Sequence, residues 1–343
     1  MASFGFGSLT RLLALASVGI VAIGSGPAGA ADAMEKTTLA LPTITLGFLT
    51  QDIASDKGFW KDQGLDVSVR IIQGIGATNA VISSSVDFAL TSGASITRAT
   101  ARGLKLVALA TLLNQTDEYV VVRKEIADKA HFDPNASLKE RAQMLQGLTI
   151  AVGGTAALPD TVLKAIQKEV GIPRDAIQTS PMLPGEFVAA FSRKAIDGFV
   201  AGPPTPQQAV VDGTGVLVTD SAKGEPTQYS PISASLLLNR ADFCAGHRSI
   251  CEKMVHGFVM AAQYVHDHPA ETLAVIKAHY GANNSDKTLE ASYEAIKSMT
   301  PLPPVTLPKM LENSDLMNVA AGFLKQEEML PRYDDIINNE FVK

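Results

Sequence analysis

The residues best suited to holding a ligand are small and polar, and they follow short apolar runs. Residues 86–90 lead into Thr91–Gly93, and residues 196–201 lead into Gly202 and Pro203. An apolar run that ends in such a break is typical of a buried strand followed by a loop at its carboxyl end. Backbone N–H groups at the start of a following helix can bind an anion or an acceptor atom. This chemistry is binding rather than catalysis.

A glycine-rich turn at residues 73–79 has a similar capacity. It resembles the dinucleotide-binding fingerprint, but Asn79 stands where the third glycine belongs, and no acidic residue follows at the expected distance. A nucleotide is therefore not predicted. The turn still lets backbone N–H groups approach a ligand at a helix N-terminus.

Catalytic and metal-binding patterns are weak in this chain. No Gly-x-Ser-x-Gly elbow follows the N-terminal segment, which argues against hydrolase chemistry. His256, His266, His268 and His279 all fall in the helical C-terminal part, away from the predicted loops. We therefore predict no catalytic residues, no metal and no cofactor, and we interpret these histidines as solvated or capping groups.

The candidate loops also lack arginine and lysine. A multiply charged phosphate or a dicarboxylate normally calls for bidentate arginine. A monoanion, such as a sulfonate or carboxylate, or a neutral heterocycle fits better. Arg98 lies about two turns into its predicted helix and could reach inward, but we expect it at the surface.

The candidate ligand-binding residues all follow predicted strands or begin predicted helices. They are Leu49, Thr50, Gln51, Gly76, Ala77, Thr78, Thr91, Ser92, Gly93, Asn114, Gln115, Gly154, Thr155, Ala156, Leu183, Pro184, Gly202 and Pro203. Leu49 and Leu183 would provide the apolar wall that such pockets need. The alternative, that these glycines and prolines merely end strands, applies to any one loop, but the recurrence of the pattern favours a site.

An internal repeat explains how these loops could meet. Residues 44–48, 64–67 and 86–93 are echoed by residues 148–152, 171–173 and 196–203, about a hundred residues later. Strand, helix, strand, helix, strand in both copies predicts two α/β lobes, each with a mostly parallel sheet. Ligands in such sheets lie outside the carboxyl ends of the strands, so two facing lobes would enclose one cleft.

The expected boundaries follow from this repeat. Lobe one comprises residues 31–123 and 232–343, and lobe two comprises residues 124–231. The polar segment 124–146 and the segment 224–231 are the expected crossings, and they would act as hinges. The first strand is expected at residues 43–48, followed by a loop at 49–52. After residue 242 the pattern is helical.

The N-terminus predicts export. Arg11 precedes an apolar run at residues 12–23, and small residues follow at 28–30, so residues 1–30 are expected to be a cleavable signal peptide. Removing them takes Arg11 away and changes the net charge from −6 to −7, which argues against a nucleic-acid partner. No later stretch is long and apolar enough to cross a membrane. We expect a periplasmic monomer.

Two cysteines, Cys244 and Cys251, lie seven positions apart. In one continuous helix their Cα atoms would be about 10 Å apart, beyond disulfide reach. Gly246 interrupts the run, so a loop could bring them together. An oxidising compartment favours a disulfide, and two buried thiols are the alternative.

Several segments carry a resemblance to a known family. They are residues 55–67, 85–89, 148–152, 189–191, 195–198 and 333–337. In this order and spacing, residues 38–343 resemble the substrate-binding proteins of ABC importers, specifically the nitrate/sulfonate/taurine/bicarbonate group and its thiamine-precursor-binding relatives. Two positions depart from the pattern: Ser85 replaces a usual glycine, and Gly202 replaces an aromatic residue common before the proline.

The resemblance implies a type II periplasmic-binding-protein fold that closes on its ligand by hinge bending. It also implies a small-molecule ligand and a membrane ABC permease with its ATPase as partners. An enzyme of pyrimidine or thiamine-precursor metabolism on the same fold is one alternative. A ligand-sensing module that docks on a receptor is another.

Overall fold

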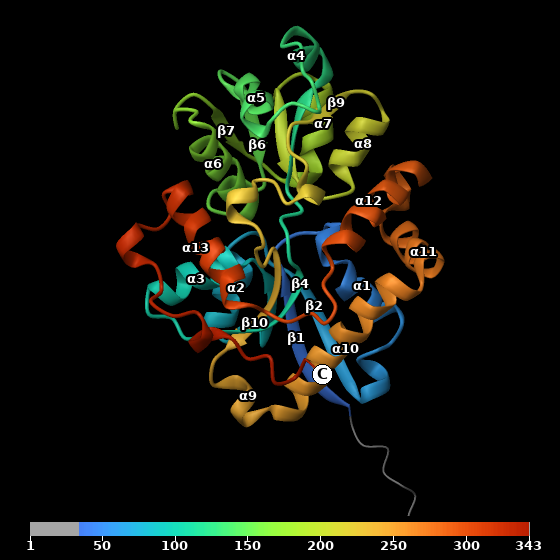
Figure 1. Cartoon of the computed structure of the whole chain (residues 1–343). Coiled ribbons are helices and arrows are strands. Elements are labelled where there is room, and N and C mark those ends of the chain that lie inside the picture. The colour runs from blue at the N-terminus through green and yellow to red at the C-terminus, as the bar shows by residue number, and fades with distance from the viewer. Residues whose placement is uncertain (1–33, 343) are drawn as a thin grey trace, which may run out of the picture. The chain divides into compact units, whose positions relative to one another are not determined.

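The computed structural model describes residues 34–342, so the expected signal peptide lies outside the described residues. The described residues contain two five-stranded sheets, with strand orders β2-β1-β3-β10-β4 and β7-β6-β8-β5-β9 (Figure 1). Each sheet and its helices form one lobe. No helix among residues 34–342 is long and apolar enough to cross a membrane.

The two sheets share one plan. In the first, β1 (Glu35–Leu41) is parallel to β2 (Leu65–Ile71) and β3 (Phe88–Thr91), while β10 (Ser235–Arg240) runs antiparallel between β3 and β4 (Leu106–Leu113). In the second, β6 (Thr149–Val152) is parallel to β7 (Gln178–Pro181) and β8 (Gly198–Ala201), while β5 (Tyr119–Arg123) runs antiparallel between β8 and β9 (Gly215–Leu217). The two sheets are therefore equivalent, but the predicted repeat matches them only in part: residues 86–93 and 196–203 contain the equivalent strands β3 and β8, whereas residues 44–48 and 171–173 contain no strand.

Helices connect and cover the strands (Figure 1). Those associated with the first sheet are α1 (Leu49–Asp56), α2 (Gly76–Ile82), α3 (Gly93–Ala101), α9 (Phe243–Gly246), α10 (Arg248–Asp267), α11 (Pro269–Tyr280), α12 (Asp286–Met299) and α13 (Pro308–Ala321). Those of the second lobe are α4 (Lys124–Lys129), α5 (Leu138–Ala142), α6 (Leu158–Val170), α7 (Phe187–Ser192) and α8 (Thr205–Val211). Helix α6 shows the local logic: a proline stands in its first turn, and Gly171 in a left-handed conformation ends it.

The first strand lies earlier than the sequence pattern indicated. Residues 35–41 form β1, whereas residues 43–48 form the loop after it and a short 3-10 turn, and α1 begins at Leu49. The expectation of a strand at 43–48 with a loop at 49–52 was wrong. The strand was missed because β1 contains polar side chains, which are not typical of a buried strand. Thr37 and Thr38 donate hydrogen bonds to the Asp87 carboxylate, and these bonds satisfy their hydroxyl groups inside the sheet.

The chain leaves the first sheet earlier than expected, whereas the expected return segment, residues 224–231, lies within the observed return. Strand β4 ends at Leu113 in the first sheet and β5 begins at Tyr119 in the second, so the outward crossing is residues 114–118. The return runs between β9 and β10, through residues 218–234. The polar segment 124–146 forms α4 and α5 instead, because its polar residues supply exposed helix surface and a capping box at Ser137 and Glu140.

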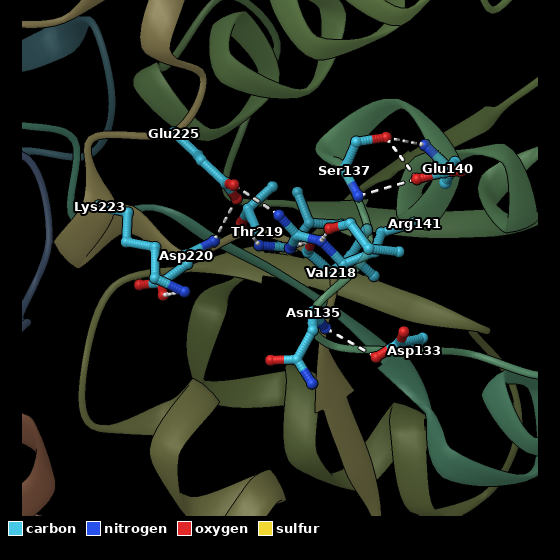
Figure 2. Close-up of polar contacts among 12 residues, drawn as sticks. Asp133, Asn135, Ser137, Glu140, Arg141, Val218, Thr219, Asp220, Lys223 and Glu225 are labelled. Atoms are coloured by element: carbon cyan, nitrogen blue, oxygen red, sulfur yellow. Dashed lines mark hydrogen bonds and ion pairs between the residues drawn. The ribbon is translucent and has the colours of Figure 1, made fainter.

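The return crossing is held by a buried ion pair (Figure 2). The guanidinium of Arg141 in α5 donates to the Glu225 carboxylate at 2.5 Å and to the Val218 carbonyl. Glu225 also accepts from the Asp220 backbone N–H at 2.8 Å. The side chains of Arg141 and Glu225 are only 6% and 12% exposed. This pairing ties the start of the return segment to the second lobe.

Cys244 and Cys251 form a disulfide with a Cα–Cα distance of 5.8 Å. The helix does break between them: α9 ends at Gly246, and α10 begins at Arg248. The Asn239 amide donates to the Cys244 Sγ at 3.0 Å. The break removes the 10 Å separation that a continuous helix would impose.

Candidate functional site

A cavity of about 440 Å³ lies where strand ends of both sheets converge. Its first-lobe lining follows β1 (residues 42–45, 47 and 48), β2 (residues 71 and 73–75) and β3 (Thr91, Ser92 and Ser95), and includes the start of β10 (Ala234 and Ser235). The second lobe contributes Gly153, Ala157, Leu158, Pro159, Leu183, Pro184 and Gly185. The outward crossing contributes Asp117 and Glu118. The position matches the ligand site expected for α/β sheets.

Four of the predicted ligand-binding residues line this cavity: Thr91, Ser92, Leu183 and Pro184. The others are not part of its lining; they are Leu49, Thr50, Gln51, Gly76, Ala77, Thr78, Gly93, Asn114, Gln115, Gly154, Thr155, Ala156, Gly202 and Pro203. Five of them directly adjoin a lining residue in sequence: Leu49, Gly76, Gly93, Gly154 and Ala156. Contact between any of these residues and a ligand stays a prediction.

Several of the remaining candidates have structural contacts instead. Thr50 and Gln51 are buried in the first turn of α1. The hydroxyl groups of Thr78 and Thr91 lie 3.3 Å apart, which links α2 to β3. The Gly93 N–H donates to the Ser233 carbonyl at 2.7 Å. These residues support the loops that border the cavity.

Other candidates join the two lobes. The Pro203 carbonyl accepts hydrogen bonds from the Thr45 hydroxyl at 2.9 Å and from the Leu46 N–H at 3.0 Å. The Ala156 carbonyl accepts from the Arg98 guanidinium at 2.7 Å. Arg98 is only 5% exposed, so its expected surface position was wrong. Its helix faces the second lobe, and the carbonyl of Ala156 satisfies part of the buried guanidinium.

The charged residues of the lining were missed by the sequence analysis. Asp117 and Glu118 are the only charged side chains among the described residues that border the cavity. Asp117 is 5% exposed, and Oε2 of Glu118 is buried without a hydrogen-bond partner. Two adjacent acidic residues directly before the apolar strand β5 were the available signal.

Burial perturbs both carboxyl groups. Loss of hydration raises the pKa of Asp117 to about 6, against an opposing hydrogen bond from its own backbone. Burial, followed by repulsion from Asp117, raises the pKa of Glu118 well above its usual value. Like charges in adjacent, poorly solvated positions disfavour each other's ionised form. The cavity is therefore acidic and electrostatically unbalanced.

Two glycines make room for Asp117. A Cβ atom on Gly47 would lie 2.3 Å from Oδ2 of Asp117, and one on Gly202 would lie 2.9 Å from the same oxygen and 2.8 Å from the Thr45 hydroxyl. The aromatic side chain common at the position of Gly202 in the resembling family would not fit. Asp117 and Thr45 fill the space that a side chain at position 202 would need. Glycine at this position therefore allows the Asp117 carboxylate to lie beside the cavity.

Metal binding has no support in the described residues. Within residues 34–342, no group of three or more histidine, cysteine, aspartate or glutamate side chains could hold a metal ion. His256 instead contacts Gln63, His266 contacts the Thr300 carbonyl, and His279 contacts Asp56. These histidines therefore take part in contacts between chain segments.

The NMT1-like family matches residues 32–284, and the chain belongs to this family. No curated protein matches the chain. The family match and the two-sheet architecture agree with the resemblance found in the sequence.

Solved structures show the same fold at low sequence identity. A protein from Bordetella bronchiseptica RB50 has a TM-score of 0.77 and 17% identity, with 90% of this chain and 95% of that chain covered. The alkanesulfonate-binding protein SsuA from Xanthomonas axonopodis pv. citri, bound to MOPS, has a TM-score of 0.68 and 13% identity, covering 90% and 98%. The periplasmic nitrate-binding protein NrtA from Synechocystis PCC 6803 has a TM-score of 0.69 and 15% identity, covering 90% and 87%.

These likenesses confirm the predicted fold class, a type II periplasmic-binding-protein fold with two α/β lobes. The two named relatives of known ligand are binding proteins rather than enzymes. At this level of identity the likeness concerns the fold, and a site must be argued from its own residues.

Proposed function

We propose that this protein is a periplasmic solute-binding protein that holds one small organic molecule in the interlobe cavity and delivers it to a membrane ABC permease with its ATPase. The observation that carries this proposal is the cavity of about 440 Å³ at the meeting point of strand ends from both sheets. Its size and mixed lining suit a small organic ligand. In this proposal the protein acts as a monomer after loss of residues 1–30.

The relatives support a binding role. SsuA is an alkanesulfonate-binding protein and NrtA is a periplasmic nitrate-binding protein. Their ligands do not transfer directly to this chain, because a bound anion here would face Asp117 and Glu118 without any cationic side chain in the lining. Of the two ligand chemistries expected from the sequence, the monoanion fits the cavity poorly. A ligand that offers hydrogen-bond donors fits better.

Filling the cavity tests the proposal. Ser95 of α3 lines the cavity and is half-buried, so Ser95→Trp would occupy ligand space. Ser298→Trp, at an exposed position of α12, serves as the control. We expect protein isolated from its host to carry a small organic molecule detectable by native mass spectrometry. We expect the Ser95 variant to lose that molecule and to fail to restore uptake in a deletion strain.

The control variant should keep both ligand and uptake. Retention of the ligand by the Ser95 variant would contradict the cavity as the binding site. Retained ligand without any effect of gene deletion on uptake would favour the sensing module over the importer component.

A further inference from the structure

The strongest unexplained feature of the molecule is the pair Asp117 and Glu118. Both side chains border the cavity, and they stand next to each other on the short crossing between β4 and β5. Apart from its own backbone, Asp117 makes no hydrogen bond or ion pair through its carboxylate among the described residues. Oε2 of Glu118 is buried and has no hydrogen-bond partner. Two carboxylates therefore face one cavity without a counter-charge.

Such an arrangement costs stability. A buried carboxylate without a partner loses hydration and gains nothing in return, and a second carboxylate beside it adds repulsion. Other buried charges among the described residues have a protein partner: Arg141 pairs with Glu225, Lys164 pairs with Asp160, and Asp315 accepts a hydrogen bond from the Tyr333 hydroxyl. Arg98, a buried cation of α3, interacts with Asp160 and Asp315, and it is not among the residues that line the cavity. A positively charged group on the ligand would supply the counter-charge that Asp117 and Glu118 lack.

We propose that the ligand is an organic cation whose protonated nitrogen binds between Asp117 and Glu118. This inference rests on the proposed solute-binding function and names the ligand class of the same site. An ammonium or amidinium group donates two or more charge-assisted hydrogen bonds and would satisfy both carboxylates together. The ligand's cationic group would pair with these carboxylates in the same way that Arg141 pairs with Glu225.

The rest of the lining describes the body of this cation. Phe48, Ile71, Ile75, Leu158 and Leu183 give the cavity apolar walls. Hydroxyl groups of Thr91, Ser92 and Ser95 lie along the opening of α3. An apolar or aromatic body that carries a single basic nitrogen suits these walls better than a hydrated inorganic cation, which needs a complete shell of oxygen ligands.

Three probes of similar shape and different charge test the proposal. Benzamidine, benzamide and benzenesulfonate share a phenyl ring and carry a positive, neutral or negative head. Thermal shift and calorimetric titration at pH 8 with millimolar probe should show binding by benzamidine and by aromatic primary amines such as phenethylamine. Benzenesulfonate should not bind, and benzamide should bind at least roughly tenfold more weakly than benzamidine.

Isosteric variants assign the effect to the two carboxylates. Asp117→Asn and Glu118→Gln should each weaken cation binding by roughly tenfold or more, because each removes one charged acceptor. Asp66→Asn, which changes an exposed carboxylate on β2, is the control and should bind like the wild type. Without ligand, the Asp117 variant should melt at a higher temperature than the wild type at pH 8. A purely structural carboxylate would give the opposite sign.

The outcomes separate this inference from the proposed function. Binding of benzenesulfonate or benzamide more tightly than every cation, unchanged in the Asp117 and Glu118 variants, would overturn the organic-cation inference and leave solute binding intact. Failure of all cations to bind, while a neutral or anionic molecule copurifies from the host, would do the same. If no probe binds and no molecule copurifies, both the inference and the solute-binding function are contradicted.

Discussion

At the scale of single residues, the composition of the cavity follows from a few close approaches. Gly47 and Gly202 have no side chain, and this lets the Asp117 carboxylate lie against the backbone of both lobes. Thr45, which neighbours the same space, donates its hydroxyl hydrogen to the Pro203 carbonyl. Because these contacts join residues up to 158 positions apart, no local pattern announces them. The Asp117 carboxylate is therefore poorly hydrated and has no hydrogen-bond or ion-pair partner from another described residue.

The pH dependence of stability should report this placement. Since burial raises the pKa of Asp117 to about 6, the folded state holds a proton that the unfolded state releases between about pH 4 and pH 6. The contribution of Asp117 to stability is therefore most favourable below this window and is lost as the pH rises through it. We expect Asp117→Asn to be more stable than the wild type at pH 7 by on the order of 1–3 kcal/mol.

Chemical denaturation of both proteins at pH 4 and pH 7, without ligand, checks this. The titratable neighbours are Glu118, whose pKa is raised by burial and by Asp117, and Tyr119, whose pKa is raised by burial and by Asp117 and Asp220. Because the raised pKa values favour the neutral forms of Glu118 and Tyr119, these groups do not reverse the expected loss of stability with rising pH. An Asp117 variant that is less stable than the wild type at pH 7 would show that the carboxylate has a stabilising partner.

At the scale of elements, the two crossings are built differently. The outward crossing is short and carries the cavity carboxylates between β4 and β5. The return crossing is long, and the Arg141–Glu225 pair fixes its first part on the second lobe (Figure 2). Lys223 and Asp220 form another ion pair in the same segment, but Lys223 is 72% exposed. Burial, rather than distance, should decide which pair matters for stability.

Substitutions in these two pairs give a matched comparison. Arg141→Met leaves Glu225 buried without its charge partner, and we expect a loss of about 3 kcal/mol in the free energy of unfolding. Lys223→Ala breaks an exposed pair and should cost less than about 1 kcal/mol. Urea denaturation measures both. The double variant Arg141→Met, Glu225→Gln should recover part of the loss because it removes the orphaned charge; equal losses for Arg141 and Lys223 would refute this view.

At the scale of the whole molecule, hydrogen bonds between helices and loops join the two lobes at several places. Arg98 of α3 reaches the Ala156 carbonyl, and the Gln208 amide of α8 reaches the Asn283 carbonyl at 3.0 Å. Arg174, just beyond α6, donates to the Ala321 carbonyl at the end of α13. These hydrogen bonds hold the two lobes together in the structure, and under the proposed function they would help to hold the lobes closed on a ligand. Contacts of this kind contribute to affinity without touching the ligand.

Arg98 tests that coupling. Arg98→Met keeps an apolar stem but removes the hydrogen bond to Ala156, so we expect ligand affinity to fall by roughly tenfold through a less favourable closed state. Arg102→Met, an exposed change at the end of the same helix, is the control and should leave affinity unchanged. Calorimetric titration gives the affinities, and small-angle scattering with and without ligand reports closure. Unchanged affinity in the Arg98 variant would show that the hydrogen bond between Arg98 and Ala156 does not contribute to ligand binding.

Much of the fold could be predicted because its signals are local. Strands β3, β6 and β8 are short apolar runs that end in small residues, and the repeat that they form indicated two similar lobes before any contact was known. Strand β1 could not be placed, because Thr37 and Thr38 look exposed until Asp87 is seen to bind them. The crossing at residues 114–118 looked like an ordinary strand-end loop.

The sequence by itself determined the fold class, the family and the strand-end loops that border the cavity, since hydrophobic runs, glycine breaks and motif spacing are properties of neighbouring residues. Only the tertiary structure decided which side chains of those loops face the cavity. Thr91, Ser92, Leu183 and Pro184 line it, whereas the other candidate residues of these loops do not. The structure alone placed Asp117 and Glu118 there without a counter-charge, because the charge balance of a cavity depends on every segment that folds around it.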